Sequence, residues 1–219
     1  MLLLIDLDNT LIDRQRGFER WTMVFLDGLK SAEAEEFAWL RSMDGDGVTP
    51  RHEFFRQARV RYGLAATVED LVAAYQALMP QLIPPPSPET LSALRTAREN
   101  GFKTCIVTNG SRATQEPKIL SDLAEAVDGW VISGEIGVRK PDPAILRYAA
   151  KACGEPLTPQ SWMIGDRPEA DILCAHRGGI RSVWLPRGAE WDEQLDYRPN
   201  LTAASFAEAV ERIRALRQP

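Results

Sequence analysis

Two aspartates, Asp6 and Asp8, directly follow the short apolar run Leu2–Ile5. An uninterrupted apolar run of this length is typical of a strand that is buried on both faces. Side chains at positions i and i+2 of a strand point to one side, so both carboxyl groups should project together from the strand's C-terminal end. Their repulsion raises the pKa of one of them or requires a cation. The pair is therefore either chemically active or an ordinary solvated acidic turn.

Similar polar residues follow other predicted strands, and ligands of open parallel sheets bind beyond the carboxyl ends of the strands. Four carboxylates, one lysine and a hydroxyl–amide turn are thus expected to meet at one edge of a sheet. The additional segments are Thr108-Asn-Gly110, Gly165-Asp166 with Asp171 five residues later, and Lys140 within Gly137-Val-Arg-Lys-Pro-Asp-Pro143.

Four acids in one crevice destabilise one another unless positive charge lies among them. Lys140 supplies one such charge. A hard divalent cation is the natural second one, and Mg²⁺ suits a carboxylate site that also receives phosphate. Phosphoryl transfer requires charge neutralisation, positioning and a proton donor for the leaving group. The residue types for each of these tasks are present.

The elements that must position these residues alternate regularly from Pro88 onward. Such alternation predicts an α/β fold, a Rossmann-like parallel sheet with helices on both faces, and Leu2–Ile5 belongs to that sheet. The predicted helices are Pro88–Asn100, Thr114–Ala126, Pro143–Cys153, Glu169–Arg177 and Ser205–Leu216, and the predicted strands are Lys103–Val107, Gly129–Ser133, Ser161–Ile164, Arg181–Leu185 and Pro199–Thr202.

The segment between the first strand and Pro88 has helical patterning and no convincing strand. It predicts an α-helical cap domain, residues 14–83, inserted into a core of residues 1–13 and 84–219. Glycine and proline segments separate its helices, and the proline-rich run Leu82–Pro88 is a stiff connector. The predicted helices are Gln15–Leu29, Ala32–Met43, Arg51–Tyr62 and Val68–Met79, the last with Thr67 as its N-cap.

The overall composition excludes several classes of protein. With 44% hydrophobic and 26% charged residues and a net charge of -5, the chain is a poor candidate for nucleic-acid or acidic-membrane binding. Its three cysteines fit neither a disulfide framework nor a zinc site. No apolar run approaches the length of a membrane span, and the N-terminus lacks a signal-peptide pattern. A cytoplasmic location is expected.

The ordered set of motifs resembles the haloacid dehalogenase (HAD) superfamily of hydrolases, in its phosphatase branch with a cap after strand one. The resemblance covers residues 1–12 and about 88–219. Each motif alone is weak, whereas four in the family's order are specific. They are Asp6-Leu-Asp-Asn-Thr10, Thr108-Asn-Gly110, Arg139-Lys-Pro-Asp-Pro143 and Gly165-Asp-Arg-Pro-Glu-Ala-Asp171.

The resemblance implies a role for each matching residue. Asp6 is expected to attack phosphorus and form an aspartyl-phosphate, and Asp8 to protonate the leaving oxygen and later deprotonate water. The implied phosphate ligands are Thr108, Asn109 through its backbone N–H, and Lys140. The implied Mg²⁺ ligands are Asp6, the carbonyl of Asp8 and Asp166, with Asp171 ordering a metal-bound water or Lys140.

The second acid also refines the reaction. Dehalogenases of this superfamily lack an acid at the position of Asp8, so the resemblance implies hydrolysis of a small phosphate monoester, either a sugar or organic-acid phosphate or a nucleoside monophosphate. Two alternatives are a phosphomutase of the same family and a non-catalytic protein that binds a phosphate ligand. Asn9 stands where many relatives have glycine. The expected protein is a monomer or homodimer.

The cap is expected to close over the core and exclude bulk water, with hinges near Ile12–Gln15 and Leu82–Ser87. Its sequence contains no motif that identifies the substrate. Asp44-Gly-Asp-Gly47 is interpreted as a turn, since it lacks the glutamate of a calcium loop. Aromatic residues such as Phe18 and Trp21 are interpreted mainly as packing, and Arg56 and Arg59 as a solvated helix face.

Overall fold

The computed structural model describes residues 1–30 and 33–217. The chain forms two compact units, an α/β unit of Met1–Ile12 with the chain from Pro85 onward, and a helical unit of Asp13–Pro84. Ala32, the predicted start of the second helix, lies outside the described residues. The assignment of core (1–13 and 84–219) and cap (14–83) domains stays a prediction.

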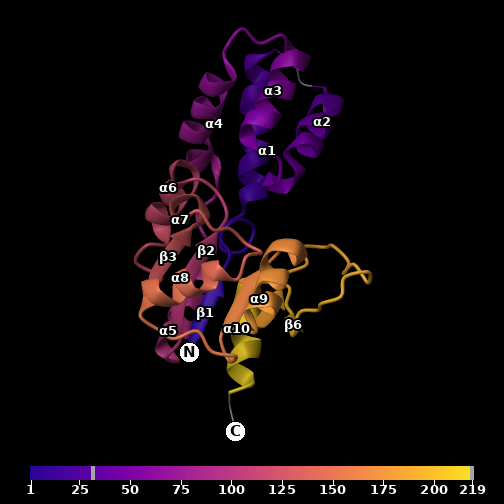
Figure 1. Ribbon diagram of the computed structural model, residues 1–219. Helices are drawn as coiled ribbons and strands as arrows, with labels where there is room; N and C mark the ends of the chain where they lie inside the picture. The colour runs from indigo at the N-terminus through magenta and orange to yellow at the C-terminus, as the bar shows by residue number, and fades with distance from the viewer. Residues whose placement is uncertain (31–32, 218–219) are drawn as a thin grey trace. The chain divides into compact units, whose positions relative to one another are not determined.

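The α/β unit is built on a parallel sheet with the strand order β3-β2-β1-β4-β5-β6. Figure 1 shows β3, β2 and β1 side by side in this sheet. Because β1 pairs with both β2 and β4, the apolar segment at the start of the chain lies in the interior of the sheet. The predicted α/β class is confirmed. The strands are β1 (Leu2–Ile5), β2 (Lys103–Thr108), β3 (Gly129–Ile132), β4 (Trp162–Gly165), β5 (Arg181–Trp184) and β6 (Leu201–Thr202).

Helices cover this sheet as the alternating sequence predicts. Leu2 and Leu4 of β1 pack in one buried cluster with residues of α8 and α9, whereas α5 packs on β2 and α10. The N-cap of α5 is Ser87, and Pro88 occupies its first turn, where a missing N–H costs nothing. The helices are α5 (Pro88–Glu99), α6 (Arg112–Asp122), α7 (Ser133–Ile136), α8 (Ala144–Cys153), α9 (Leu173–Gly178) and α10 (Phe206–Ala215).

Two short elements near the strand ends differ from the sequence prediction. The chain forms α7 directly after β3, where no helix is predicted. The predicted helix Glu169–Arg177 is instead a π-helical turn, Pro168–Ile172, followed by α9. Such single π turns occur frequently at functional sites.

The helical unit contains α1 (Arg14–Gly28), α2 (Ala34–Asp44), the 3₁₀ turn Gly45–Gly47, α3 (Arg51–Tyr62) and α4 (Val68–Leu82). Thr67 and Asp70 form a capping box at the start of α4, as the N-cap prediction requires. Helix α4 continues through Pro80 to Leu82, three residues beyond the predicted end. The aromatic side chains Phe18, Trp21, Phe54, Phe55 and Tyr75 are buried together in the core of this unit.

A buried ionic cluster lies within the helical unit. Asp44 accepts hydrogen bonds from the guanidinium of Arg14, one of them at 2.6 Å, and from Arg51 at 2.8 Å. It also accepts from the N–H of Gly47, which closes the predicted turn. Arg14 reaches the hydroxyl of Tyr75 at 3.3 Å. Only 5% of Arg14 and 2% of Asp44 is exposed, so two cations enclose one buried acid.

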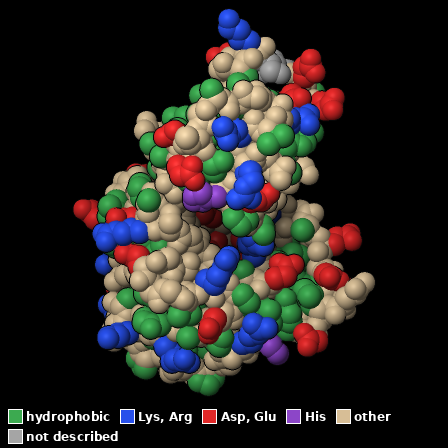
Figure 2. Space-filling view, turned by 45° about the horizontal axis from the view of Figure 1, so that its top comes forward, with side chains coloured by type: hydrophobic (Ala, Val, Ile, Leu, Met, Phe, Trp, Pro, Cys, Tyr) green, Lys and Arg blue, Asp and Glu red, His purple; other side chains and the backbone are tan. Residues whose placement is uncertain are grey.

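The surface carries mixed charge. Figure 2 shows acidic and basic side chains interspersed over the visible face, which agrees with the small net charge of -5. Within residues 1–30 and 33–217, no helix combines the length and apolar character needed to cross a membrane.

Candidate active site

The candidate site lies where the interior strands of the sheet end. Asp6 follows β1, Thr108 is the last residue of β2, and Asp166 follows β4. Because β1 lies between β2 and β4 and all three are parallel, their carboxyl ends are neighbours. The backbone N–H of Asp6 donates to the carbonyl of Ile164 at 2.9 Å, which extends the β1–β4 pairing to the site.

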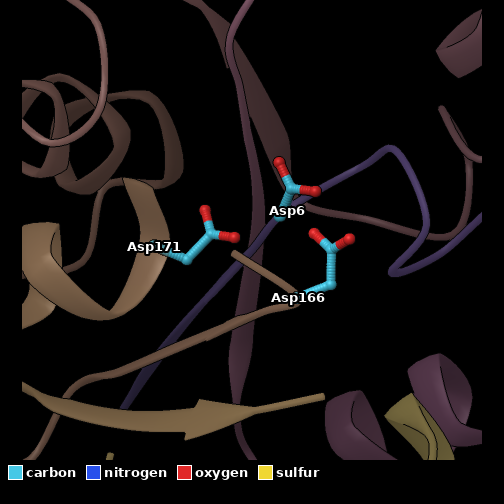
Figure 3. A group of neighbouring side chains, drawn as sticks. All are labelled: Asp6, Asp166 and Asp171. Carbon is cyan, nitrogen blue, oxygen red and sulfur yellow. The ribbon is translucent and has the colours of Figure 1, made fainter. Parts of the chain in front are cut away.

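Three carboxyl groups converge at this edge. Asp6, Asp166 and Asp171 each offer an oxygen, and these oxygens all lie within 4.8 Å of one another. Figure 3 shows the three carboxyl groups gathered in one region, from the residue after β1, the residue after β4 and the π-helical turn. A side chain at Gly165 would bring a Cβ to 2.2 Å from an oxygen of Asp171. Glycine at this position therefore permits the close approach of Asp171.

Lys140 is the central cation of this group. Its Nζ lies 2.5 Å from Asp6 and 2.8 Å from Asp171, and it donates to the carbonyl of Val107 at 2.6 Å. Only 3% of the residue is exposed. Burial alone would lower the pKa of Lys140, but the charges of Asp171 and Asp6 outweigh burial and hold that pKa above its usual range. Lys140 is therefore a permanent cation beside Asp6.

The side chain of Asn109 fixes the backbone around Lys140. Its amide donates to the carbonyl of Lys140 at 2.9 Å, and its oxygen accepts from the N–H of Lys140 at the same distance. The turn after β2 is held in addition by the hydroxyl of Ser133, which accepts from the N–H of Gly110 at 3.0 Å. The segments of the second and third motifs are thus joined through hydrogen bonds.

The acids outnumber the cation in this group. Burial raises the pKa of Asp6 to about 7, with Lys140 opposing the shift and Asp171 adding to it. The ionised form of Asp6 is therefore disfavoured in this group. Closely spaced carboxylate oxygens are the donors that Mg²⁺ prefers, and positive charge among them would lower the pKa of Asp6. The residues present fit a hard divalent cation.

Asp8 is directed to a second cluster that sequence reasoning missed. Its two oxygens lie 2.8 and 3.0 Å from Nζ of Lys118, and one of them accepts from the amide of Gln115 at 2.9 Å. The same amide reaches the hydroxyl of Thr108 at 2.5 Å. Gln115 and Lys118 both belong to α6. The strand-end acid Asp8 is thus connected to the strand-end hydroxyl of Thr108 through a helix.

Asp166 also has partners that the sequence did not indicate. Its backbone carbonyl accepts from the indole of Trp184 at 2.9 Å, and its carboxylate lies 3.3 Å from the guanidinium of Arg187. Arg187 and Asp166 are distant in sequence and follow neighbouring strands, β5 and β4. The pairing of β4 with β5 brings the segments that follow these strands close together.

The loop that carries Asp8 has a conformation that suits its sequence. Asn9 has φ of 63°, in the left-handed region, and asparagine tolerates this region better than most residues other than glycine. Its N–H donates to the carbonyl of Ile12 at 2.7 Å and closes the turn. Asparagine can therefore occupy this turn position.

The structure brings all the sequence-predicted site residues to one edge of the sheet. Asp6, Lys140, Asp166 and Asp171 form one group, while Asp8 and Thr108 share Gln115, and Asn109 binds Lys140. The signal that would have found the missed residues is modest. Gln115 and Lys118 are three residues apart on α6, next to Ile119, so two polar side chains occupy the buried face of an amphipathic helix.

A family model described as haloacid dehalogenase-like hydrolase matches residues 1–179 of the 219. The chain belongs to this family. The match includes every predicted site residue, from Asp6 to Asp171.

Two curated relatives have names that describe enzymes acting on phosphate esters. Phosphoserine phosphatase of Thermus thermophilus is 35% identical over 123 residues, which is 55% of this chain and 48% of the relative. Pyrimidine 5'-nucleotidase YjjG of Escherichia coli is 38% identical over 125 residues, 56% of this chain and 54% of the relative. The matched part of the chain spans about half the length of each of these relatives.

A solved structure with a similar fold is YfnB of Bacillus subtilis, a protein assigned to the HAD hydrolases and bound to magnesium. It superimposes with a TM-score of 0.81 at 19% identity and covers 97% of both chains. The likeness at this identity concerns the fold, an α/β unit together with a helical unit.

Proposed function

We propose that this protein hydrolyses a small phosphate monoester in the presence of Mg²⁺, through an aspartyl-phosphate formed on Asp6. The observation that carries this proposal is the placement of a buried carboxylate, Asp6, against Lys140 and two further acids, with the separate acid Asp8 two residues later. The two curated relatives named above act on phosphate esters, which supports the same class of reaction.

The first step transfers the phosphoryl group to the protein. A carboxylate oxygen of Asp6 bonds to phosphorus while the bond between phosphorus and the ester oxygen breaks. The electron pair of that bond stays on the ester oxygen, which takes the proton of Asp8, so a neutral alcohol leaves. Thr108, the N–H of Asn109 and Lys140 would bind the phosphoryl oxygens during this step.

The second step releases inorganic phosphate. A water molecule gives a proton to the Asp8 carboxylate, its oxygen bonds to phosphorus, and the bond between phosphorus and Asp6 breaks. Asp8 then holds its proton again, and Asp6 is free for another cycle. The sum is one phosphate monoester and one water converted to one alcohol and one hydrogen phosphate, so every atom and proton is accounted for.

Residues of the three-acid group would hold the cation. We infer that Asp6, the carbonyl of Asp8 and Asp166 bind Mg²⁺, which when bound neutralises charge on the nucleophile and the phosphoryl group. Both oxygens of Asp171 face donors of the protein, since one lies 2.8 Å from Lys140 and the other accepts from the N–H of Arg167 at 3.0 Å. This supports a role for Asp171 in ordering Lys140 rather than as a direct ligand.

The acid at position 8 favours phosphate esters over haloacids. An alcohol is a poor leaving group unless its oxygen is protonated, whereas a halide leaves as a stable anion and needs no proton. Asp8 therefore has a task in phosphate hydrolysis that it would lack in dehalogenation. Within phosphate esters we propose a small cytoplasmic metabolite, either a sugar or organic-acid phosphate or a nucleoside monophosphate.

The test is hydrolysis of 4-nitrophenyl phosphate, followed by phosphate release from a panel of metabolites. We expect activity with Mg²⁺ and none with a chelator. Asp6→Asn should reduce kcat by about 10⁴-fold or more while the circular dichroism spectrum stays unchanged. Asp122→Asn, which changes an exposed acid of α6, is the matched control and should retain full activity. A folded wild type without Mg²⁺-dependent hydrolysis, or an active Asp6→Asn, contradicts the proposal.

A further inference from the structure

Helix α6 carries two polar side chains on its buried face. Gln115 is 1% exposed and Lys118 is 5% exposed, next to Ile119 at 0%. Burying a lysine is costly unless an acid accompanies it, and a buried glutamine must satisfy its amide. The reaction steps described above use neither residue. Because both residues are buried at this edge of the sheet, the groups that they contact indicate their role.

Lys118 and Gln115 hold the carboxylate of Asp8. Lys118 contacts both oxygens, at 2.8 and 3.0 Å, and Gln115 contacts one of them at 2.9 Å. The Asp8 side chain is half-buried, with 26% of it exposed, whereas the lysine side chain is 3% exposed. The more deeply buried cation therefore contacts both oxygens of the acid.

The chemistry of the neighbours fixes the orientation of the Gln115 amide. Its oxygen lies 2.7 Å from Nζ of Lys118, and its nitrogen lies 2.9 Å from a carboxylate oxygen of Asp8. The opposite orientation would place NH₂ against an ammonium and an oxygen against a carboxylate, which is repulsive on both sides. The nitrogen of Gln115 must therefore face Asp8.

This orientation determines how Thr108 uses its hydroxyl. The nitrogen of Gln115 is a donor only, so the oxygen of Thr108, 2.5 Å away, accepts from it. The hydroxyl hydrogen of Thr108 then remains available to donate to a different acceptor. An anionic phosphoryl oxygen requires such a donor, and a chain of donors from Lys118 through Gln115 strengthens it.

We infer that Gln115 and Lys118 are positioning residues for the proposed reaction, Lys118 acting through Asp8 and Gln115 acting through Thr108. The inference rests on the proposed function and adds two residues to it. It makes α6 the element that couples proton transfer to phosphoryl binding.

The two residues should give different kinetic signatures. A misplaced Asp8 matters most when the leaving group is strongly basic, because a good leaving group departs without a proton. A misdirected Thr108 weakens binding of the phosphoryl group, which every substrate shares. Loss of Lys118 should therefore depend on the leaving group, and loss of the Gln115 donor should not.

The experiment compares kcat/KM for 2,4-dinitrophenyl, 4-nitrophenyl and phenyl phosphate, whose phenols are progressively weaker acids. We expect Lys118→Met to lower kcat/KM for phenyl phosphate by about 10²-fold and for the dinitrophenyl ester by only a few-fold. Lys118→Arg should recover part of the loss. Gln115→Met should lower kcat/KM about 10-fold for all three esters. Glu116→Gln, which removes an acid paired with Arg112 on the same helix, should match the wild type.

A double variant shows whether Lys118 acts through Asp8, and it avoids an unpaired buried charge if Lys118→Met alone fails to fold. Asp8→Asn/Lys118→Met should hydrolyse the dinitrophenyl ester within about threefold of Asp8→Asn. If the double variant is more than about threefold slower than Asp8→Asn, the inference is wrong. It is also wrong if a folded Lys118→Met shows the same dependence on the leaving group as the wild type. In both cases, hydrolysis by the wild type still supports the proposed function. A uniform loss by Lys118→Met, or a leaving-group-dependent loss by Gln115→Met, also overturns the inference. Absence of hydrolysis by the wild type overturns both.

Discussion

Two buried groups of charged residues, one in each unit, have opposite balances of charge. In the helical unit Arg14 and Arg51 enclose a single acid, Asp44. In the α/β unit Lys140 lies among three acids, and Asp6 and Asp171 are its direct partners. The first group has one more cation than acids, whereas the second has more acids than cations.

The pKa values of the central acids express this difference. Burial alone would raise the pKa of Asp44, but hydrogen bonds and charge from Arg14 and Arg51 outweigh burial and lower it. Burial raises the pKa of Asp6 to about 7 despite Lys140. Comparable burial thus gives opposite shifts, and the sign depends on the partners. The lowered pKa of Asp44 reflects its two arginine partners, and the raised pKa of Asp6 reflects a burial that Lys140 does not offset.

The largest expected effect comes from removing the single acid of the group in the helical unit. Asp44→Asn leaves two arginines around an uncharged amide, so the free energy of unfolding at pH 7 should fall by about 3 kcal/mol. Denaturant unfolding measures the change. Asp46→Asn, at an exposed position in the same turn, should change stability by less than about 0.5 kcal/mol. Equal effects of the two substitutions would contradict a special role for Asp44.

The stability difference between the wild type and Asp44→Asn should depend on pH. Because the pKa of Asp44 is lower in the folded state, its contribution is fully present above the unfolded-state pKa of about 3.9 and is lost as pH falls through the folded-state value. The stability difference between wild type and Asp44→Asn should therefore be constant near neutral pH and shrink below about pH 4. A difference that stays unchanged down to pH 3 would contradict the ionic origin.

A smaller effect should follow from supplying the acidic group around Lys140 with a cation. Mg²⁺ at a hundred times its Kd should stabilise the wild type by about 2.7 kcal/mol, because it binds the folded state only. Thermal unfolding with Mg²⁺ or with a chelator measures the shift. Asp166→Asn should lose most of it, and Asp44→Asn should keep it. An equal Mg²⁺ shift in Asp166→Asn would mean that the cation binds elsewhere.

The smallest effect has the opposite sign to that of Asp44→Asn. Without a divalent cation, Asp6→Asn removes one of several crowded negative charges, and its oxygen can still accept from Lys140. The free energy of unfolding at pH 8 should therefore rise by about 1 kcal/mol, because the repulsion among the crowded acids is reduced. Urea unfolding in the presence of a chelator measures it. A clear loss of stability would show that Asp6 is balanced by Lys140 after all.

The site residues at the strand ends could be predicted because side chains alternate between the two faces of a strand. Leu2–Ile5 read as a buried strand, and the two-residue period then placed Asp6 and Asp8 together at its end. Alternation of strands and helices placed Thr108 and Asp166 at the same edge. The topology follows from a repeating pattern of whole elements, so errors of one or two residues at helix ends do not alter it.

The partners of those residues depend on finer geometry. The rotation of α6 about its axis decides whether Lys118 faces the sheet or the solvent. From the sequence alone, a single lysine in a helix is predicted to be exposed. Asp44 was recognised as part of a turn, but its charge is used only because Arg14 and Arg51 reach it from two other helices. Contacts of this kind depend on packing distances that a local pattern does not contain.

The position of β1 within the sheet has a consequence for synthesis of the chain. Leu2 pairs with Lys103, and Leu3 pairs with Trp162, so β1 gains its neighbours only about 100 and 160 residues later. At about 5–20 residues per second, the ribosome needs on the order of 5–20 seconds to reach β2. The contacts internal to Asp13–Pro84 can form before then. The strand that precedes Asp6 therefore emerges well before its partner strands, and its apolar side chains need protection in the interval.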